Sequence, residues 1–454
     1  MKSFCIISFI FMSVMTQSQV VDLPDLFRYV LVNEICADFD GDGLVDGVVD
    51  TNDDGQIQVI EAEAVMGLYY SHNIGSVSGI EYFTNIEIIQ LSAGYGPPDG
   101  LDLSQSTELI ELYLNGAHLN SIDVTGSPNL RILEMGSNPQ GGLTNIDITQ
   151  NPNLEYLNLV WNELESIDVS QNQNLLNLNL EMNRLTNIDV TQNPNLEYLR
   201  LGWNNLTTLD VSQNPKLLHL FVYLNHLIEL DISHNIDLIY LACYNNDLTN
   251  LIINNPNLTS LIASYNQFTS LDVSNAPNLT GIGCGFNQIT HLDFSQNTNL
   301  RVIGCQENQL VNLNINNGNN TILTDLSTYD NPNLACIQVD DVIYANSQIC
   351  DIANYDGWCK DETTSYSEEC SLGIEDNTIT NFTLYPNPVK DILTIGNTGS
   401  HEITSIKLYD ALGRLVLAEI DNVNQVDIAH LNSGLLFVKI ETDKGELTKK
   451  IVKN

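Results

Sequence analysis

The sequence NPNLEYLNLVWNELESIDVSQ, residues 151–171, returns 42 residues later as NPNLEYLRLGWNNLTTLDVSQ, residues 193–213. A further version, LNLNLEMNRLTNIDVTQNPN at residues 176–195, lies between them, so the true period is 21 residues. Self-similarity at a fixed period of about 20–50 residues is typical of solenoids and other repeat architectures. This stretch therefore predicts stacked coils rather than one globular core.

Aligning the copies gives the pattern LxxLxLxxNxLxxLDVS, repeated in about twelve coils between residues 80 and 335. The alternation LxL predicts a short strand with one buried face, and LxxLDV begins the return path of each coil. A single coil buries too little apolar surface to offset the entropy of ordering it, so neighbouring coils must share one core. The first leucine of each copy falls at Leu109, Leu130, Leu154, Leu175, Leu196, Leu217, Leu238, Leu258, Leu279 and Leu300, with less regular outer copies at Ile86 and Leu323.

One asparagine recurs where each predicted strand ends. Its amide can donate and accept at once, so a stacked column of asparagines can satisfy the main chain of neighbouring turns. We therefore interpret this column as structural. It comprises Asn138, Asn162, Asn183, Asn204, Asn225, Asn246, Asn266, Asn287 and Asn308.

The repeated pattern resembles the leucine-rich repeat family, whose units read LxxLxLxxNxL. The short 21-residue form is most similar to bacterial leucine-rich repeats such as internalins. The resemblance covers roughly residues 80–335 and implies an arc with a parallel sheet on its inner face.

The x positions of LxxLxLxxN are expected to point outward from the sheet. Aromatic side chains gather there although they make up only 7% of the chain. Strand propensity alone enriches aromatic residues, but exposed aromatics are also typical of binding surfaces. We predict a ligand-binding face for a protein or a glycan, on which Arg200 anchors an acidic group. The aromatic residues are Tyr113, Tyr156, Trp161, Tyr198, Trp203, Phe221, Tyr223, Tyr240, Tyr244, Tyr265, Phe286 and Tyr329.

A second column is acidic, and each of its members is followed two residues later by Ser or Thr. This spacing indicates hydrogen bonding within solvated turns. Binding of adventitious divalent cations is an alternative, whereas paired carboxylates for glycoside hydrolysis need two unlike environments in a cleft, which a uniform column does not offer. The column contains Asp102, Asp123, Asp147, Asp168, Asp189, Asp210, Asp231, Asp272 and Asp293.

The stretch DTNDDGQIQVIE, residues 50–61, fits the calcium-loop pattern D-x-[DN]-x-[DN]-G-x5-E completely. Calcium takes about six to eight oxygen ligands, which this spacing folds around one centre. The upstream DFDGDGLVD, residues 38–46, is spaced similarly but has Val49 at the twelfth position, so a second ion there is expected to be weaker or shared. An acidic turn without metal is the alternative. The predicted Ca²⁺ ligands are Asp50, Asn52, Asp54, Gln56, Gln58 and Glu61, with Asp38, Asp40, Asp42 and Asp46 upstream.

Residues 24–36 and 61–70, on either side of these loops, are predicted to form short helices. The unit then resembles EF-hand and dockerin-type calcium loops. Its expected role is structural, capping the N-terminal end of the solenoid.

The nine cysteines fall into groups. Cys243, Cys284 and Cys305 occupy inward positions of the repeat and are predicted to be small buried residues. The cluster that follows the repeats is predicted to form disulfides, because the protein is expected to be exported. Zinc is the alternative, although no CxxC spacing supports it. The disulfide candidates are Cys336, Cys350, Cys359 and Cys370, whose pairing the sequence leaves open.

After Cys370 the pattern changes to alternating strands joined by Asn, Gly and Asp turns, which predicts a small β-sandwich. The motifs YPNP (residues 385–388), DALGR (410–414), Ser433-Gly434 and the closing KKIVKN resemble the C-terminal sorting domain of type IX secretion. That resemblance implies a Gram-negative bacterium, export across the outer membrane, and removal of the tail with release or surface attachment. A carbohydrate-binding or adhesive sandwich is the alternative.

Five segments are expected along the chain. Residues 1–18, with Lys2 before a largely apolar run, are predicted to be a secretory signal peptide too short to span a bilayer. Residues 19–79 form the N-terminal helical cap with its calcium loops, residues 80–335 the solenoid, residues 336–372 a cysteine-containing cap and linker, and residues 373–454 the sorting domain.

The formal net charge of −41 is concentrated in residues 1–372, which hold 46 acidic and 8 basic side chains. This charge argues against nucleic acid and anionic membranes as partners, because both need basic patches. We predict a secreted or cell-surface, non-enzymatic binding protein of the adhesin or receptor type, with no transmembrane segment. The alternatives are a structural scaffold and, less favoured, a polysaccharide-acting enzyme.

Overall fold

The chain forms two compact units, Met1–Glu369 and Cys370–Asn454, which are described separately. The predicted signal peptide, Asn138 and residues 411–413 of the DALGR motif lie outside the described residues. The structure is a computed structural model. It describes residues 19–72, 75–91, 100–116, 119–136, 142–351, 356–370, 382–397, 403–410, 414–420, 424–442 and 445–454.

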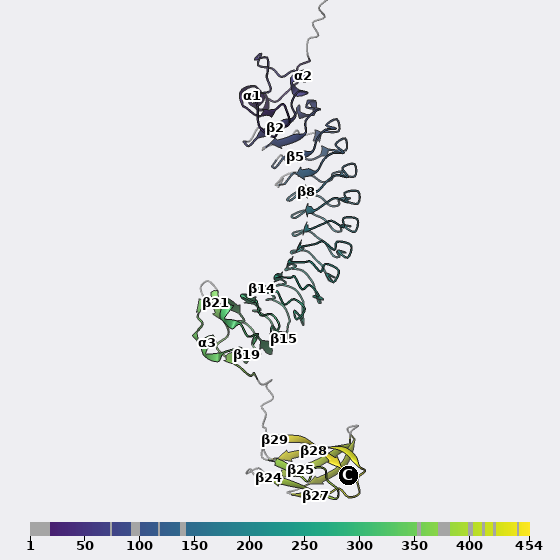
Figure 1. Cartoon of the computed structure of the whole chain (residues 1–454), viewed down its shortest axis with the longest axis vertical. Helices are drawn as coiled ribbons and strands as arrows, with labels where there is room; N and C mark the ends of the chain where they lie inside the picture. Colours follow the sequence, from purple (N-terminus) through teal and green to yellow (C-terminus); the bar gives the residue numbers. More distant parts are fainter. Residues whose placement is uncertain are drawn as a thin grey trace, which may run out of the picture. The chain divides into compact units, whose positions relative to one another are not determined.

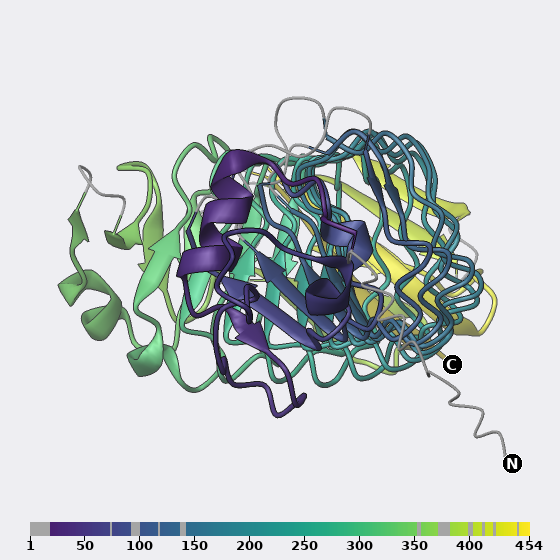
Figure 2. The ribbon, with the colours of Figure 1, turned by 90° about the horizontal axis from the view of Figure 1, so that it is seen from above.

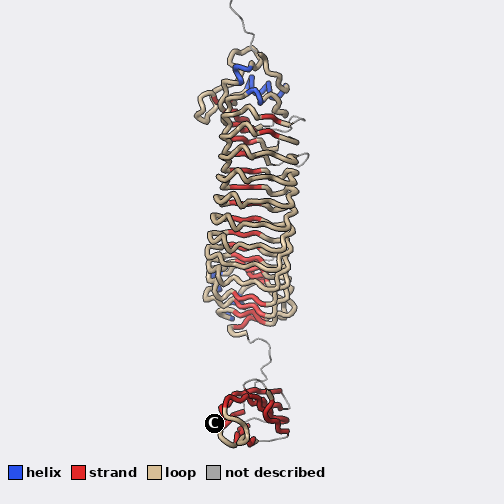
Figure 3. The backbone as a smooth tube through the Cα atoms, turned by 90° about the vertical axis from the view of Figure 1, so that its right-hand side faces the viewer, coloured by secondary structure: helices blue, strands red, loops and turns tan. Residues whose placement is uncertain are grey.

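The first unit is a solenoid with a long sheet on the inner side of its arc (Figure 1). The 16 strands follow the order β1-β2-β3-β5-β7-β8-β9-β10-β11-β12-β13-β14-β16-β18-β21-β20. Strand pairing is parallel from β2 to β21, and the register sets Leu178 beside Leu157 on one side and Leu199 on the other. Viewed along the axis, successive coils nearly superimpose (Figure 2), and from the side their strands form one column (Figure 3). The predicted parallel-sheet solenoid is thus confirmed.

The strands of this sheet within the repeats are three or four residues long, as the LxL alternation predicts. They are β3 (Ile88–Leu91), β5 (Glu111–Tyr113), β7 (Ile132–Glu134), β8 (Tyr156–Asn158), β9 (Asn177–Asn179), β10 (Tyr198–Arg200), β11 (His219–Phe221), β12 (Tyr240–Ala242), β13 (Ser260–Ile262), β14 (Gly281–Gly283), β16 (Val302–Gly304) and β18 (Asp325–Ser327). Two small sheets lie on the return path, β4 (Leu101–Asp102) with β6 (Ile122–Asp123), and β15 (His291–Asp293), β17 (Asn312–Asn314), β19 (Cys336–Gln338) with β22 (Ser365–Ser367).

The repeated leucines form one continuous core. Each first leucine from Leu109 to Leu300 is buried, and the cluster of buried residues runs from Val21 to Trp358. Cys243, Cys284 and Cys305 are buried and unbonded in this core, as predicted. Burial raises the pKa of the Cys243 and Cys284 thiols to about 12, so these side chains pack as small apolar groups.

The predicted asparagine column bridges adjacent coils through buried hydrogen bonds, as Asn204 illustrates. Its side-chain amide donates to the carbonyls of Leu180 (2.9 Å) and Leu201 (3.1 Å). Its side-chain oxygen accepts a hydrogen bond from the amide of Leu185 at 2.9 Å. Asn331 makes the same kind of contacts and extends the column beyond the residues predicted.

A second buried asparagine column lies on the return path, where the sequence pattern did not predict one. Asn193 donates to the carbonyls of Val169 and Asn172, both at 2.9 Å, and is fully buried. Unlike that of Asn204, its side-chain oxygen has no hydrogen-bond partner. The other members with such an oxygen are Asn151, Asn172, Asn214, Asn235 and Asn297.

The N-terminal cap corrects one prediction. Helix α1 (Asp25–Asn33) forms within residues 24–36 as expected, but α2 spans only Val59–Ala62. The rest of the predicted second helix ends in strand β2 (Gly67–Tyr70), which pairs with β1 (Ala37–Asp38) and with β3. Pairing with the exposed edge of β3 satisfies main-chain groups that a helix would leave unpaired, and this tertiary gain outweighs local helix propensity. A short 3-10 helix, Ile80–Tyr82, completes the cap.

The C-terminal cap closes the other end of the sheet with β21 (Asp356–Cys359) and β20 (Cys350–Asp351), next to helix α3 (Val342–Ser347). Trp358 is buried there and donates its indole N–H to the carbonyl of Leu323 at 3.0 Å. A disulfide joins Cys350 to Cys359, and Cys336 and Cys370 are also disulfide-bonded. The predicted disulfides are confirmed, which leaves no thiolate in this cluster for zinc.

The second unit contains two antiparallel sheets that bury one shared core. One sheet has the order β23 (Phe382–Tyr385), β24 (Ile392–Asn397), β27 (Gln425–Asp427). The other has the order β26 (Leu415–Ile420), β25 (Ile403–Asp410), β28 (Gly434–Thr442), β29 (Gly445–Lys453). Phe382 and Leu393 from the first sheet pack with Leu408 and Val438 from the second, which is the layering expected of a sandwich.

Candidate binding surface and calcium loops

The outward face of the parallel sheet carries stacked aromatic rings. Because coils pair in register, a residue at one x position lies directly beside its counterpart in the next coil. Tyr198 stacks on His219 with centroids 4.6 Å apart, and Phe221 contacts Tyr240 at 5.0 Å. Every predicted face residue is partly or fully exposed, so none of them belongs to the core.

Arg200 lies within this cluster of rings. Its guanidinium is 5.5 Å from the Tyr198 ring centroid and 5.2 Å from that of Phe221, which are cation–π distances. Burial, with a smaller effect of Arg200, lowers the pKa of His219, so this imidazole is neutral at neutral pH. Burial raises the pKa of Glu181, against smaller opposing effects of Tyr223 and Arg200. Whether Arg200 also anchors an acidic group of a ligand stays a prediction.

Four of the predicted residues lie beside the strands rather than on them. Trp161, Trp203, Tyr265 and Phe286 occupy the turn that follows each strand, with φ between 55° and 60°. This left-handed conformation favours Gly, Asn and Asp and costs a bulky residue roughly 1–2 kcal/mol. Trp161, Trp203 and Tyr265 are 48%, 51% and 48% exposed, so burial does not offset this cost.

A groove of about 520 Å³ runs beside this turn column. Trp203 and Tyr265 contribute to its lining, together with Asn205, His226 and Asp247. It therefore combines exposed rings with amide, imidazole and carboxylate groups, a mixture typical of sites that orient a polar ligand.

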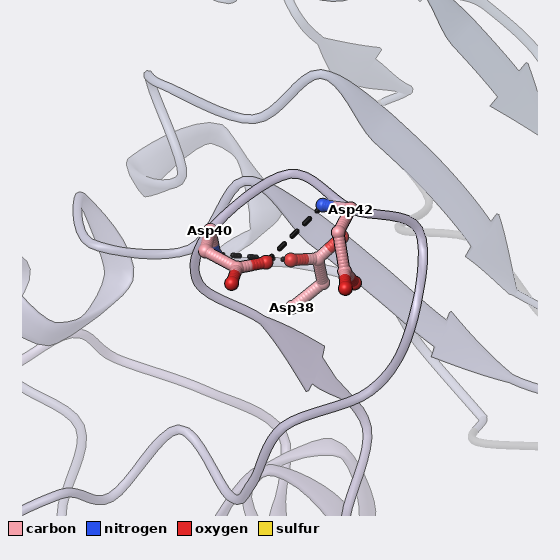
Figure 4. Close-up of side chains that lie close together, drawn as sticks. All are labelled: Asp38, Asp40 and Asp42. Carbon is pink, nitrogen blue, oxygen red and sulfur yellow. Dashed lines mark hydrogen bonds between the residues drawn. The ribbon is translucent and has the colours of Figure 1, made fainter.

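The predicted calcium loops differ in how their carboxylates are arranged. Ligand oxygens of Asp38, Asp40 and Asp42 lie within 4.8 Å of one another, and Figure 4 shows the three side chains gathered inside one loop. Asp38 accepts hydrogen bonds from the amides of Gly41 (2.7 Å) and Gly43 (2.9 Å), whose positive φ lets the loop close. Burial raises the pKa of Asp38, but these bonds and those from the amides of residues 40 and 42 outweigh it and lower that pKa.

The loop at residues 50–61 is closed mainly by Asp50 and Glu61. Asp50 accepts from the amide of Gly55 at 2.8 Å, and Glu61 accepts from the amides of Thr51 (2.9 Å) and Gln58 (3.0 Å). The Gln58 side chain donates to Asp54 at 3.0 Å. Within the described residues, the carboxylates that gather as a metal site would require are those of Asp38, Asp40 and Asp42. Calcium binding by either loop stays a prediction.

The aspartate column forms local turn hydrogen bonds, as predicted. Asp189 accepts from the hydroxyl (2.7 Å) and the amide (2.9 Å) of Thr191. The same bond to the amide two residues later recurs at Asp102, Asp123, Asp147, Asp168, Asp210, Asp231, Asp272 and Asp293.

Comparison with known proteins agrees with both units. Residues 150–170 and 192–212 match the Leucine Rich repeat family model, and residues 383–454 match the Secretion system C-terminal sorting domain. The chain carries leucine-rich repeats and a secretion-system sorting domain. No curated protein matches it. The sorting domain indicates secretion or attachment at the outer surface by the type IX route.

Solved structures with similar folds include the functional domain of InlJ from Listeria monocytogenes, 22% identical, which covers 88% of this chain and 93% of that one with a TM-score of 0.52. An internalin, InlF, from the same species is 20% identical over 76% and 94% of the two chains, with a TM-score of 0.47. A leucine-rich repeat protein of Leptospira interrogans is 22% identical over 57% and 74%, with a TM-score of 0.42. The InlJ likeness supports the fold alone. Across the described residues, no helix has the length and apolarity that a bilayer crossing requires.

Proposed function

We propose that this chain is a secreted or surface-attached, non-enzymatic binding protein. The outward face of the parallel sheet and the turn column beside it would hold the partner. The sorting domain supports a place outside the cell. The repeats support binding, because a solenoid buries its core between coils and leaves an extended concave surface available.

The observation that carries this proposal is the pair of exposed tryptophans at left-handed positions. Trp161 and Trp203 gain little from folding where they lie, since each is about half exposed and each occupies a backbone conformation that disfavours it. Tryptophan is, with tyrosine and arginine, enriched among the residues that dominate binding energy at interfaces. The left-handed φ recurs at Met182, Leu224 and Glu307, so it belongs to the turn of each coil. Contact with a partner would account for the exposed rings that stand there.

Replacing both rings, Trp161→Ala with Trp203→Ala, is expected to weaken partner binding by at least about tenfold, since one such anchor contributes roughly 2 kcal/mol or more. The melting temperature should change little, because neither ring lies in the core. The mature repeat region serves as bait in a pull-down from material of the organism's surroundings. The affinity of the captured partner for the wild type and the variants is then measured by surface plasmon resonance. Ile252→Ala is the control, because Ile252 is 56% exposed. It lies on the return path of its coil, away from the outward face of the sheet. Unfolding of the double variant, or unchanged capture by it, contradicts the proposal.

We further propose that the N-terminal loops bind calcium. Asp38, Asp40, Asp42 and Asp46 would hold one ion, and the predicted ligands from Asp50 to Glu61 a second, through carboxylate, amide and carbonyl oxygens. The fit rests on the gathered carboxylates and on donors that are all oxygen, which suits Ca²⁺. An ion in the first loop would fix β1, which pairs with β2 and thereby continues the sheet.

Millimolar calcium is therefore expected to raise the melting temperature of the N-terminal cap, because an ion that binds only the folded loop at about 100 times its Kd adds roughly 2.7 kcal/mol. Asp40→Asn should remove the calcium-dependent rise in melting temperature that is due to the first loop. Asp54→Asn should remove the rise that is due to the second loop. Asp53→Asn is the matched control, since Asp53 is exposed and outside the predicted ligand set. The proposal fails if calorimetry of the wild type with calcium shows neither heat nor a melting shift.

A further inference from the structure

One half of the binding face carries no formal charge on its strands. From β11 to β16 the strand positions hold aromatic, hydroxyl, aliphatic or glycine side chains, and the imidazole of His219 is neutral at neutral pH. Charged side chains occur only beside these strands, as Arg301 and Glu307 do on either side of β16. Earlier coils place Glu134, Glu181 and Arg200 on the same face. In a chain with a net charge of −41, an uncharged half of the face favours a neutral ligand over a polyanion.

This half contains a glycine floor, made of Gly281, Gly283, Gly285 and Gly304. Gly281 lies in β14, and a Cβ added to it would meet nothing within 4 Å. Its partner in the register is Val302, so a branched side chain is accommodated in the same row. Glycine within a strand is less favourable than alanine, and it often marks a place where a ligand approaches the backbone closely.

Gln306 supplies a polar anchor at this floor. A Cβ on Gly285 would lie 2.8 Å from the Gln306 side-chain carbon Cδ, and one on Gly304 would lie 3.3 Å from its oxygen Oε1. Those two glycines therefore make room for the Gln306 side chain. Its Oε1 is buried and accepts no hydrogen bond. The Gln306 side chain as a whole is partly exposed, so the accessible part of its amide is available to a ligand hydroxyl.

Aromatic rings flank the same coils. Tyr265 stacks on Phe286 with centroids 4.0 Å apart, and the amide of Phe286 donates to the main-chain carbonyl of Gln306 at 3.0 Å. The rings and the Gln306 side chain are therefore held in adjacent coils by the main chain.

We infer that the glycine floor, with Gln306 and the rings of Tyr265 and Phe286, binds a neutral saccharide. The flat C–H face of a sugar ring packs on an aromatic ring or on bare backbone, while its hydroxyls hydrogen-bond to polar groups such as the exposed part of the Gln306 amide. A peptide cannot add here as a strand, because β14 is paired with β13 on one side and β16 on the other. This inference rests on the proposed function and names the ligand class of its face.

Gly281→Val tests the inference, because it fills the floor without a clash and places a strand-favouring residue in β14. Native affinity gels containing laminarin, mannan or xylan measure binding, with alginate as an anionic probe. We expect at least one neutral polysaccharide to retard the wild type and alginate to leave it unaffected. Gly281→Val should lose at least about tenfold in affinity with an unchanged or higher melting temperature, and Gln306→Leu should also lose affinity.

Ser270→Val is the matched control, since Ser270 is exposed on the return path of a neighbouring coil, away from the outward face of the sheet. It should bind like the wild type. Retardation by none of the neutral polysaccharides, unchanged affinity of Gly281→Val, or a fall in its melting temperature overturns the inference. A protein partner whose capture depends on Trp161 and Trp203, without any saccharide binding, overturns the inference and leaves the proposed function standing.

Discussion

Asn204→Ala is expected to lower the free energy of unfolding by about 2–4 kcal/mol, more than the same change at either Asn193 or Asn205. The reason is the amide of Leu185, which is buried and donates to the Asn204 side-chain oxygen. The carbonyl groups lose less, since Leu180 keeps a bond from Asn183 and Leu201 keeps one from Asn225. The substitution thus strands one donor without a partner. Urea unfolding followed by circular dichroism measures the change.

Asn193→Ala, in the second column, provides the graded comparison. The carbonyls of Val169 and Asn172 also accept main-chain amides, and the Asn193 oxygen has no bond to lose. We therefore expect roughly 1–2 kcal/mol, while Asn205→Ala, at an exposed neighbour of Asn204, should stay within about 0.5 kcal/mol of the wild type. Equal losses at Asn204 and Asn193 would show that the stranded amide is not the main cost. Hydrogen exchange at Leu185 should accelerate only in Asn204→Ala.

The solenoid could be predicted because its pattern repeats. Where one copy departs from the pattern, the other copies still define the alignment. Leu157, Leu178 and Leu199 can therefore be aligned and assigned to one core from the sequence alone. The first asparagine column is found in the same way, since it follows a recognisable LxL strand. The second is not, because Asn193 stands beside Gln192 and Pro194, in a polar stretch that indicates an exposed turn. Its burial follows from coil stacking and cannot be derived from one coil.

The N-terminal cap has no repeats to average over, so its sequence is less informative. The twelve-residue pattern at 50–61 is the stronger calcium motif by spacing, because it contains Glu61 where the loop at 38–46 has none. In the structure the Glu61 carboxylate accepts main-chain amides of Thr51 and Gln58, whereas the carboxylates gathered together are those of Asp38, Asp40 and Asp42. Ligand spacing defines which residues share a loop, but competing hydrogen bonds decide where each oxygen points.

On the candidate face, the sequence correctly indicated which residues avoid the core. It could not separate Tyr198 and Tyr240, which lie on the strands, from Trp203 and Tyr265, which lie in the turn column, because the distinction depends on φ. The glycine floor was also not recognised, since an isolated glycine has no side-chain signal. Gly281, Gly283 and Gly304 become a surface only when β14 and β16 are placed side by side.

Lowering the pH from 5 toward 2 is expected to lower the melting temperature of the repeat region by at least a few degrees. The hydroxyl and amide of Thr191 hold the pKa of Asp189 below its usual value, and they outweigh burial and repulsion from Asp210 and Asp168, which raise it. The pKa values of Asp102, Asp147, Asp168, Asp210, Asp231 and Asp272 are lowered likewise. A lowered pKa in the folded state adds stability above the unfolded pKa of about 3.9, and this stability is lost as the pH falls through the folded pKa.

Each contribution is small because these carboxylates face solvent, but the column titrates together. The triple variant Asp168→Asn, Asp189→Asn, Asp210→Asn keeps an oxygen that accepts the same turn amides and no longer titrates. It should melt close to the wild type at pH 7 and lose less on going to pH 3, as scanning calorimetry across this range would show. If stacked like charges dominated, acid would instead relieve repulsion, and the wild type would melt higher at pH 3 than at pH 7. The short bonds from Thr191 to Asp189, repeated coil after coil, are the reason to expect the opposite.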